Sequence, residues 1–298
     1  MCFTAVEFVN DPNVVGQTYW YLCPFTDIKE GTDVVAPLGR RNGEQVGVVR
    51  KVEFADEFSA PYPVAYIKKI KRVLGETVKN SSFRIVKKRS LNSTVTLMDI
   101  YAPLVARKAE AGQFIILRVG EDGERIPLTV AGYNRRVGTV RIIFQIVGGT
   151  TMLLNAMNAG DCLADFVGPL GCATNTDGLK KVCIIGGGVG CAIALPIAEK
   201  LHKSGCEVHT IIGFRNKDLL ILEDEFAACS DKLTVMTDDG SYGSRGLVTA
   251  PLKEAIEQGE NYDEVIAIGP LIMMKFVVAV TKPYGVKTTV SMNPIMID

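Results

Sequence analysis

The stretch "VCIIGGGVGCAIALPIAEKL", residues 182–201, reads as a buried strand that runs through a glycine-rich turn into a helix. Four glycines occupy the turn: Gly186, Gly187, Gly188 and Gly190. Glycines let the backbone approach a pyrophosphate closely, and the start of the helix supplies free N–H groups and a positive dipole end. The first two positions of the dinucleotide-binding pattern fit, but Cys191 stands at the third, so the strict spacing fails. The segment therefore predicts a nucleotide phosphate site, with a tight strand-to-helix turn as the alternative.

Short apolar strands alternate with helix-length segments on both sides of this turn. The strands are "KVCIIG", "EVHTIIGF", "KLTVMT", "DEVIAIG" and "VKTTVSM", and the helical segments include "LLILEDEFAAC" and "GLVTAPLKEAIEQ". Such alternation predicts a doubly wound parallel sheet covered by helices, with the ligand site at the carboxyl ends of the strands. We therefore expect an NAD(P)-binding α/β domain over residues 179–298.

The segment "TDDGSYG", residues 237–243, follows the third of these strands. Asp238 or Asp239 could accept hydrogen bonds from an adenosine ribose diol, and either carboxylate would repel a 2'-phosphate, which favours NADH. Arg215, after the second strand, favours NADPH instead, because a guanidinium there could hold the 2'-phosphate of that coenzyme. The sequence leaves this coenzyme choice open, and the acidic pair could instead form a solvated turn.

The segment "IGPLIMMK", residues 268–275, follows the fourth strand. Because the carboxyl ends of parallel strands meet at one edge, Gly269 and Pro270 are candidates for the same ligand site. Their alternative role is a turn that starts a helix.

Residues 79–178 have a different pattern and are predicted to form an antiparallel β-barrel. The runs "FRIVKKRSL", "STVTLMDIYAP" and "GQFIILRVG" follow one another with turns between them. Their single helical signal is "TTMLLNAMNAGD".

Within this segment, "ERIPLTVAGYN", residues 124–134, places polar groups in a hydrophobic strand. Arg125 precedes a strand fixed by a proline, and the hydroxyl of Thr129 follows, which suits a ligand that is anionic at one end. A flavin nucleotide is such a ligand. About 20 residues further on, a second anion-binding turn is predicted at a helix start. Its residues are Gly148, Gly149, Thr150 and Thr151.

The first 78 residues are predicted to form a separate small β domain. Two apolar runs flank the turn from Gly39 to Gly43 as in a hairpin, and Pro61, Pro63 and the basic run "IKKIKRV" mark the end of the domain.

Composition excludes several classes of function. The 298 residues carry 33 Lys and Arg against 33 Asp and Glu, so no overall field favours nucleic acid or anionic membranes. No apolar run reaches the length of a membrane span and no signal peptide is evident, which together indicate a cytoplasmic protein. The eight cysteines form no Cys-x-x-Cys pair, and we expect most to be buried, reduced thiols. His202 and His209 lack metal-ligand spacing and are expected to be structural.

From about residue 82 to the end, the sequence resembles the small flavin subunit of ferredoxin:NADP oxidoreductases and sulfide dehydrogenases, and the electron-transfer subunit of dihydroorotate dehydrogenase. These proteins belong to the ferredoxin reductase superfamily. The matching segments, in order, are "GQFIILRV", "RIPLT", "VGGTTMLL", "IGGGVG", "NKDLLILEDE", "TDDGSYGSRGLVT", "IGPLIMMK" and "VSMNPIMID".

The resemblance implies roles for the residues singled out above. Arg125 would contact the FAD phosphates, and the run Pro127, Leu128 and Thr129 would lie beside the isoalloxazine with Thr129 near N5. The turn Gly148–Thr151 would hold the pyrophosphate. The nicotinamide nucleotide would be lined by the glycine turn together with Asp238, Asp239, Gly269, Pro270 and Met273. Hydride would pass between nicotinamide and flavin without a side-chain acid or base.

The resemblance also implies an iron–sulfur partner, either an iron–sulfur flavoprotein large subunit or a ferredoxin. In the resembling subunits, "NPIM-x-D" leads into a cysteine-rich segment that binds a [2Fe-2S] cluster, whereas this sequence stops at Asp298. It therefore has no cluster ligands in the expected place, and a truncated chain and a natural form without the cluster are both open. A second departure is Ile193, where the superfamily usually has a proline.

The segment "GQTYWYLCPFTDIKEGTDVVAPLGRRNGEQVGVVRKV" resembles the amino-terminal domain of the primosomal replication helicase, which binds DNA ends. Residues 1–80 contain 10 Lys and Arg and 10 Asp and Glu, which is not the basic footprint of a nucleic-acid surface. We therefore expect an interaction or packing module there. Two alternatives to the electron-transfer subunit are a nucleic-acid-associated module with a degenerate reductase body and a cluster-free flavin reductase.

Overall fold

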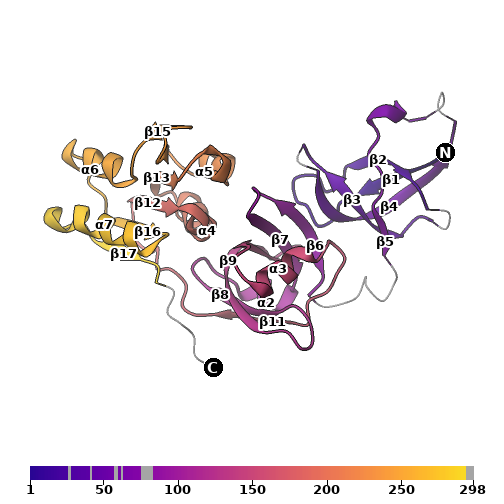
Figure 1. The fold of residues 1–298 in the computed structure, drawn as a ribbon, viewed down its shortest axis with the longest axis horizontal. Coiled ribbons are helices and arrows are strands. Elements are labelled where there is room, and N and C mark those ends of the chain that lie inside the picture. Colours follow the sequence, from indigo (N-terminus) through magenta and orange to yellow (C-terminus); the bar gives the residue numbers. More distant parts are fainter. Residues whose placement is uncertain (26–27, 41, 57–59, 62, 75–82, 293–298) are drawn as a thin grey trace.

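The computed structural model describes residues 1–25, 28–40, 42–56, 60–61, 63–74 and 83–292. They form an eleven-stranded sheet and a six-stranded sheet (Figure 1). The expected boundary at residues 78 and 79 and the terminal segment "NPIMID" lie outside the described residues. In the described part of the chain, no helix is both long and apolar enough to cross a membrane.

The six-stranded sheet is parallel, as the alternating pattern predicted, with the order β15-β14-β13-β12-β16-β17. Its strands are β12 (Lys181–Gly187), β13 (Glu207–Phe214), β14 (Lys232–Thr237), β15 (Ser244–Arg245), β16 (Glu264–Ile268) and β17 (Thr288–Val290). From β12 the chain adds β13, β14 and β15 on one side, and it then returns to place β16 and β17 on the other side of β12. The strand order therefore reverses between β12 and β16. In doubly wound folds, ligands bind at such a switch point.

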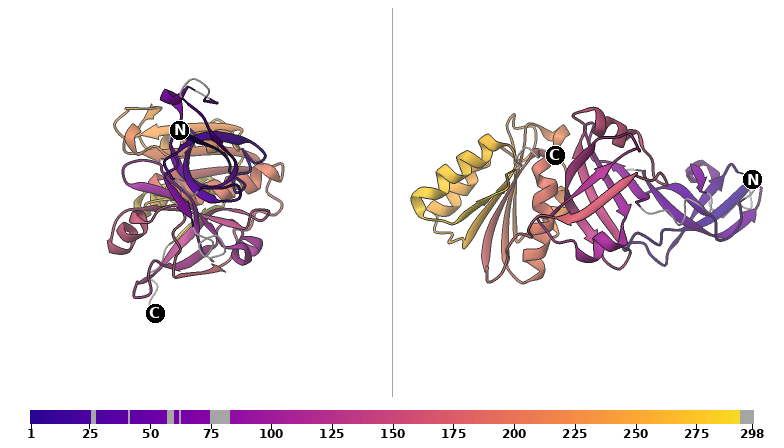
Figure 2. Two further views of the ribbon diagram at one scale, coloured as in Figure 1. Left: turned by 90° about the vertical axis from the view of Figure 1, so that its right-hand side faces the viewer. Right: turned by 90° about the horizontal axis from the view of Figure 1, so that it is seen from below.

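Helices cover both faces of this sheet. They are α4 (Cys191–Lys203), α5 (Glu223–Ala227), α6 (Thr249–Glu257) and α7 (Leu271–Thr281), with short 3-10 turns η2 (Gly188–Gly190), η3 (Lys217–Leu219) and η4 (Lys282–Tyr284). One apolar core lies under α4 and α5, and a second lies under α6 and α7. In the right-hand view of Figure 2, α4 lies between the sheet and the antiparallel strands. The first core accordingly includes side chains from those strands, among them Val95, Ala131 and Ile143.

Six antiparallel strands form the barrel that the middle of the sequence predicted. They are β6 (Ile85–Ser90), β7 (Val95–Tyr101), β8 (Phe114–Arg118), β9 (Arg125–Asn134), β10 (Thr139–Gln145) and β11 (Asp165–Leu170). The order β11-β8-β9-β10-β7-β6 is closed where the Ile85 N–H donates to the Asp161 carbonyl, 2.8 Å away, beside a bridge between Arg84 and Cys162. The barrel interior is apolar, with fully buried side chains such as Ile100 and Leu117.

Two helices accompany the barrel, α2 (Pro103–Lys108) and α3 (Gly149–Ala156). The sequence predicted only α3. Helix α2 has six residues and starts at Pro103, so its apolar pattern is too short to separate from the strand before it.

The first residues also form antiparallel strands, with the predicted hairpin between β3 and β4, where Leu38 pairs with Gly43. These strands are β1 (Cys2–Glu7), β2 (Thr18–Cys23), β3 (Asp33–Leu38), β4 (Gly43–Phe54) and β5 (Arg72–Leu74), with the 3-10 turn η1 (Val64–Tyr66) between β4 and β5. A bridge between Leu22 and Lys69 joins β2 to the segment before β5, which gives the ring seen end-on in the left-hand view of Figure 2.

Strand β4 pairs directly with the barrel sheet: its residues Glu44 and Gln45 lie opposite Lys88 and Lys87 of β6. Buried charges accompany this junction. The Arg84 guanidinium lies 3.2 Å from the Asp33 carboxylate, and the two side chains are only 8% and 4% exposed. The amino-terminal strands are thus joined to the barrel by one continuous sheet, and the division of the chain at residue 78 stays a prediction.

Candidate functional site

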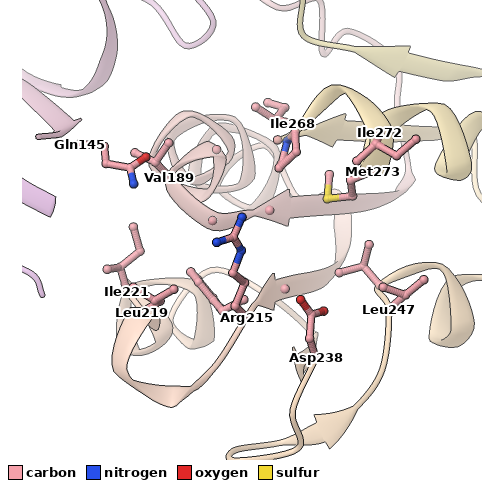
Figure 3. A pocket seen from close by; sticks show the side chains of 18 of the residues that line it. Gln145, Val189, Arg215, Leu219, Ile221, Asp238, Leu247, Ile268, Ile272 and Met273 are labelled. Carbon is pink, nitrogen blue, oxygen red and sulfur yellow. The ribbon is translucent and has the colours of Figure 1, made fainter. Parts of the chain in front are cut away.

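A pocket of about 700 Å³ opens at the carboxyl edge of the six-stranded sheet (Figure 3). It lies at the switch point, between the turn after β12 and the turn after β16. Seven of the residues that the resemblance placed around the nicotinamide nucleotide line it: Gly187, Gly188, Gly190, Asp238, Gly269, Pro270 and Met273. The structure therefore brings together three segments that are separated by about 30 to 50 residues each in the sequence.

Two of these glycines allow the β12 and β16 turns to pack against each other. A Cβ on Gly190 would lie 2.5 Å from the Ile268 carbonyl oxygen, and a Cβ on Gly187 would lie 2.4 Å from the Met273 sulfur. Both distances are shorter than real Cβ contacts. The glycine pattern thus has a packing cause, and it places the first residues of α4 at the pocket.

Gly186 does not line the pocket in the described residues. Its missing Cβ position lies 2.7 Å from the sulfur of Cys191, the residue that replaces the third glycine of the sequence pattern. Cys191 is fully buried, and this burial raises the pKa of its thiol. The departure from the glycine pattern is therefore accommodated inside the turn, away from the pocket.

The two neighbouring aspartates lie in different places. Asp238 lines the pocket, whereas the Asp239 carboxylate accepts a hydrogen bond from the Ser241 N–H at 2.9 Å and closes a turn. Hydrogen bonding from Ser241 lowers the pKa of the exposed Asp239 carboxyl. Arg215 also lines the pocket, and Figure 3 shows its guanidinium and the Asp238 carboxylate pointing into it from the same side. The pocket thus offers a cation and an anion side by side.

Part of the pocket comes from the barrel, which the sequence did not predict. Thr94 and Val95 at the start of β7 and Gln145 at the end of β10 line it. No local signal marks them, because they reach the pocket only through the packing of α4 against the barrel. Apolar side chains complete the lining on the sheet side: Leu219, Ile221, Leu247 and Phe276.

The predicted flavin residues of β9 lie on the barrel and outside this pocket. Alternation along the strand puts Arg125, Pro127 and Thr129 on one face, while Leu128 packs against the barrel core. Only the backbone of Leu128 is therefore available to a ligand on the outer face. From Arg125 to Thr129 the strand pairs with β8, and its pairing with β10 begins at Val130.

The Arg125 side chain is 56% exposed and lies 2.7 Å from the Asp165 carboxylate of β11. The residue before it, Glu124, accepts a hydrogen bond from the Thr150 hydroxyl at 3.1 Å. This contact joins the start of β9 to the first turn of α3. The structure thus brings Glu124, the residue before Arg125, to the second predicted anion-binding turn, 26 residues away in the sequence.

The first turn of α3 is open to solvent. The Thr151 hydroxyl oxygen accepts hydrogen bonds from the Val147 and Gly148 N–H groups at 3.0 and 2.9 Å, which fixes the turn. A Cβ added at Gly148 or Gly149 would meet no atom within 4 Å. The adjoining Val147 side chain is 74% exposed. The helix start that Glu124 contacts therefore has an uncovered apolar neighbour, which fits a flavin nucleotide with its phosphates at the turn.

His209, which the sequence assigned a structural role, is buried between two partners. Its ring nitrogens lie 2.9 Å from the Tyr262 hydroxyl and 3.0 Å from the Glu207 carboxylate. His202 lies near the end of α4, and its ring nitrogen Nδ1 is 3.9 Å from the Asp231 carboxylate.

Comparison with families of known proteins finds no matching family model. Among curated proteins, the chain is 48% identical over 224 residues to an uncharacterised protein in the adh 3' region of Clostridium beijerinckii, covering 72% of this chain and 76% of the relative. It is 42% identical over 214 residues to a homologue of the dihydroorotate dehydrogenase B (NAD(+)) electron transfer subunit from Thermotoga maritima, covering 72% and 75%.

Solved structures give the same picture. A chain of the NADH-dependent reduced ferredoxin-NADP oxidoreductase aligns with a TM-score of 0.69 and 41% identity, over 74% of this chain and 79% of that one. Phthalate dioxygenase reductase aligns with a TM-score of 0.59 at 17% identity, over 70% and 66%, which shows a shared fold. The likeness to the ferredoxin reductase superfamily is thus confirmed, while the helicase likeness of the first 78 residues finds no support in these comparisons.

Proposed function

Because the chain belongs to the family of dihydroorotate dehydrogenase B electron-transfer subunits, we propose that it transfers electrons between NAD(P)H and an iron–sulfur partner through FAD. One observation carries this proposal. The pocket at the sheet edge is lined by both the nucleotide-binding turns and the barrel residues Thr94 and Gln145. A nicotinamide nucleotide held there would lie against the barrel that carries the candidate flavin residues.

The barrel residues support FAD as the resident group. Arg125 and the α3 turn, joined through Glu124 and Thr150, offer a cation and helix N–H groups to a pyrophosphate. Pro127 and Thr129 share the outer face of β9 and would lie along the ring system. When bound, FAD supplies the chemistry that converts a two-electron hydride transfer into single-electron transfer.

In the sheet-edge pocket, the residues bind and orient the nucleotide. The turn from Gly187 to Gly190 and the start of α4 would face the pyrophosphate. Apolar Met273 and Ile272 on α7 narrow the opposite wall and limit water there (Figure 3). Asp238 and Arg215 would determine which adenosine ribose is accepted.

The partner is proposed from the relatives. The Thermotoga relative bears the name of an electron transfer subunit homologue, and the aligned protein is described as an NADH-dependent reduced ferredoxin-NADP oxidoreductase. We therefore propose an iron–sulfur flavoprotein large subunit or a ferredoxin as the electron partner. A [2Fe-2S] cluster of the kind expected from the resemblance would have to be held outside the described residues or by that partner.

The proposal is tested by recording the visible absorption spectrum of the purified chain under argon, before and after addition of NADH or NADPH. Bound FAD that bleaches with either coenzyme would support the proposal. A protein that takes up no FAD would overturn it. Turnover with dye acceptors, but no complex with an iron–sulfur protein, would instead favour the cluster-free flavin reductase.

Replacing Arg125 with alanine should weaken FAD binding by about 10- to 100-fold, since a charge-assisted hydrogen bond to phosphate contributes roughly 1.5–3 kcal/mol. The measurement is FAD retention during gel filtration, followed by titration of the apoprotein. Arg136→Ala, in the exposed turn after β9, is the matched control and should retain FAD. Equal retention by the two variants would show that Arg125 does not contact the flavin.

Replacements of Asp238 and Arg215 should move coenzyme preference in opposite directions. Asp238→Ser removes the charge that repels a 2'-phosphate and should raise the ratio of kcat/KM for NADPH over NADH by about tenfold. Arg215→Ala should lower the same ratio by a similar factor. Asp239→Ser is the control, because its carboxylate is held in the turn by Ser241. A shift with Asp239→Ser alone would place the ribose at the turn instead of at Asp238.

A further inference from the structure

Two cysteines from different strands lie directly opposite each other in the amino-terminal sheet. Cys2 of β1 pairs in register with Cys23 of β2. In an antiparallel pair, residues in this relation have Cα atoms about 4.5–5.5 Å apart, which is within the range that a disulfide bridges. Cys23 also influences the Cys2 thiol directly, since it helps to raise the pKa of that thiol. The register therefore places the two cysteines at a separation that a disulfide can span.

This arrangement is unlike that of the remaining cysteines. All eight are free thiols, and five of them are buried, as the sequence predicted for most. Within the strand pairings of the described residues, no other cysteine faces a cysteine: Cys183, for example, pairs with His209 and Val265, and Cys162 bridges to Arg84. The Cys2 and Cys23 pair is thus a local feature of β1 and β2.

The surrounding contacts hold both sulfurs in place. The amino group of Met1 donates to the Ala55 carbonyl at 2.7 Å, which fixes the start of β1 between β2 and β4. The Cys23 thiol donates to the Phe25 carbonyl at 3.5 Å. The pairing of β1 with β2 already holds the two cysteines next to each other. Forming the disulfide in the folded protein therefore requires little further loss of conformational entropy.

The two thiols differ in access. Cys23 is 5% exposed, whereas Cys2 is only partly buried. Burial raises the pKa of the Cys2 thiol and the neighbouring Cys23 adds to this rise, while the terminal ammonium group opposes it. The raised pKa lowers the thiolate fraction of Cys2, so its place in the sequence of steps follows from exposure: a dissolved oxidant can reach Cys2 first, and Cys23 is placed to react second.

We propose that Cys2 and Cys23 form a reversible dithiol–disulfide site that low-molecular-weight disulfides oxidise. The Cys2 thiolate attacks one sulfur of glutathione disulfide, a mixed disulfide forms, and one glutathione thiolate leaves. The Cys23 thiolate then attacks the Cys2 sulfur, the protein disulfide forms, and the second glutathione leaves. Two electrons pass from the cysteines to the glutathione disulfide, and the two cysteine protons end on the two glutathione thiols.

The disulfide would link β1 to β2 at the end of the molecule far from the nucleotide-binding sheet (Figure 1). It closes a loop of about 20 residues, so it stabilises the amino-terminal strands by restricting their unfolded state. Because the pocket is remote, oxidation leaves flavin and nucleotide binding unchanged. The inference is therefore independent of the proposed function, and either one can fail alone.

The test uses the full chain, which is first incubated with glutathione disulfide at neutral pH. The protein is then unfolded in the presence of an alkylating agent that blocks the remaining free thiols, and its disulfides are mapped by mass spectrometry. The expected result is a peptide pair linked through Cys2 and Cys23, which dithiothreitol separates. The thermal midpoint of the first unfolding transition should rise by about 5 °C on oxidation. In Cys23→Ser, Cys2 should carry glutathione instead, without the rise in midpoint.

Cys172→Ser is the matched control, because Cys172 is an exposed single cysteine, and it should leave the linked peptide unchanged. Phenylarsine oxide, which binds closely spaced dithiols, gives a second measurement on the reduced protein. Its binding should be lost in both Cys2→Ser and Cys23→Ser and kept in Cys172→Ser. Two results would overturn the proposal. One is that Cys23 of the wild-type protein is still alkylated as a free thiol after oxidation, and the other is that Cys2→Ser binds phenylarsine oxide as well as the wild type does.

Discussion

Replacing Arg84 with methionine should lower the free energy of unfolding by about 3–5 kcal/mol, because it breaks a buried ion pair by removing one of its two members. Arg84 lies 3.2 Å from Asp33, and both side chains are almost completely buried. Arg84 also precedes β6 at the point where the barrel closes against Cys162. The pair therefore stabilises the junction between the amino-terminal strands and the barrel. Urea unfolding, followed by circular dichroism, measures the change.

Arg50→Met is the matched control for this substitution. Arg50 also pairs with a carboxylate, Glu7 at 2.6 Å, but its side chain is 48% exposed, so its loss should cost no more than about 1 kcal/mol. Equal losses for Arg84→Met and Arg50→Met would contradict the assignment of Arg84 to a buried ion pair that holds the junction.

Replacing Gly190 with alanine should abolish most of the reduction of bound flavin by NADH, with a loss of at least about tenfold in rate. The added Cβ would lie 2.5 Å from the Ile268 carbonyl oxygen and 2.8 Å from the Gly269 Cα. These are backbone atoms next to a buried strand, so the start of α4 must move away from the β16 turn. We expect about 1–3 kcal/mol of destabilisation from overpacking as well.

Anaerobic stopped-flow absorbance at the flavin band measures the rate of reduction in the Gly190 variant. FAD content should stay at the wild-type level, because the candidate flavin residues lie on the barrel. Gly120→Ala is the control, since a Cβ there meets no atom within 4 Å and the residue needs no left-handed backbone. If Gly190→Ala reduced its flavin at the wild-type rate, the turn after β12 would not be part of the nucleotide-binding site.

Much of the fold could be predicted because its signals are local. The apolar runs around the glycine turn predicted the parallel sheet, and the turn between Gly39 and Gly43 predicted the β3–β4 hairpin that the structure contains. Local signals failed where elements are short, as with α2, and where strands far apart in the sequence pair, as β4 does with β6. The pairing of Gln45 with Lys87 was not foreseen, because register between distant strands depends on the packing of both faces.

The candidate site was predictable in part for the same reason. The sequence located the turns after β12, β14 and β16, but it could not decide between Asp238 and Asp239. Only the fold separates them, because the Ser241 N–H holds one carboxylate in a turn and leaves the other facing the pocket. Arg215 was noticed in the sequence, and the structure adds that it lies in the same pocket.

The sequence by itself determined the classes of structure: a glycine turn between strand and helix, alternating strands and helices, and antiparallel strands before them. These follow from preferences that act over a few neighbouring residues. Only the tertiary structure decided that Gln145 reaches the pocket at the sheet edge, that Arg84 meets Asp33, and that Cys2 faces Cys23. The physical reason is that burial and strand register join residues that are far apart along the chain, and no local pattern records which of them will meet.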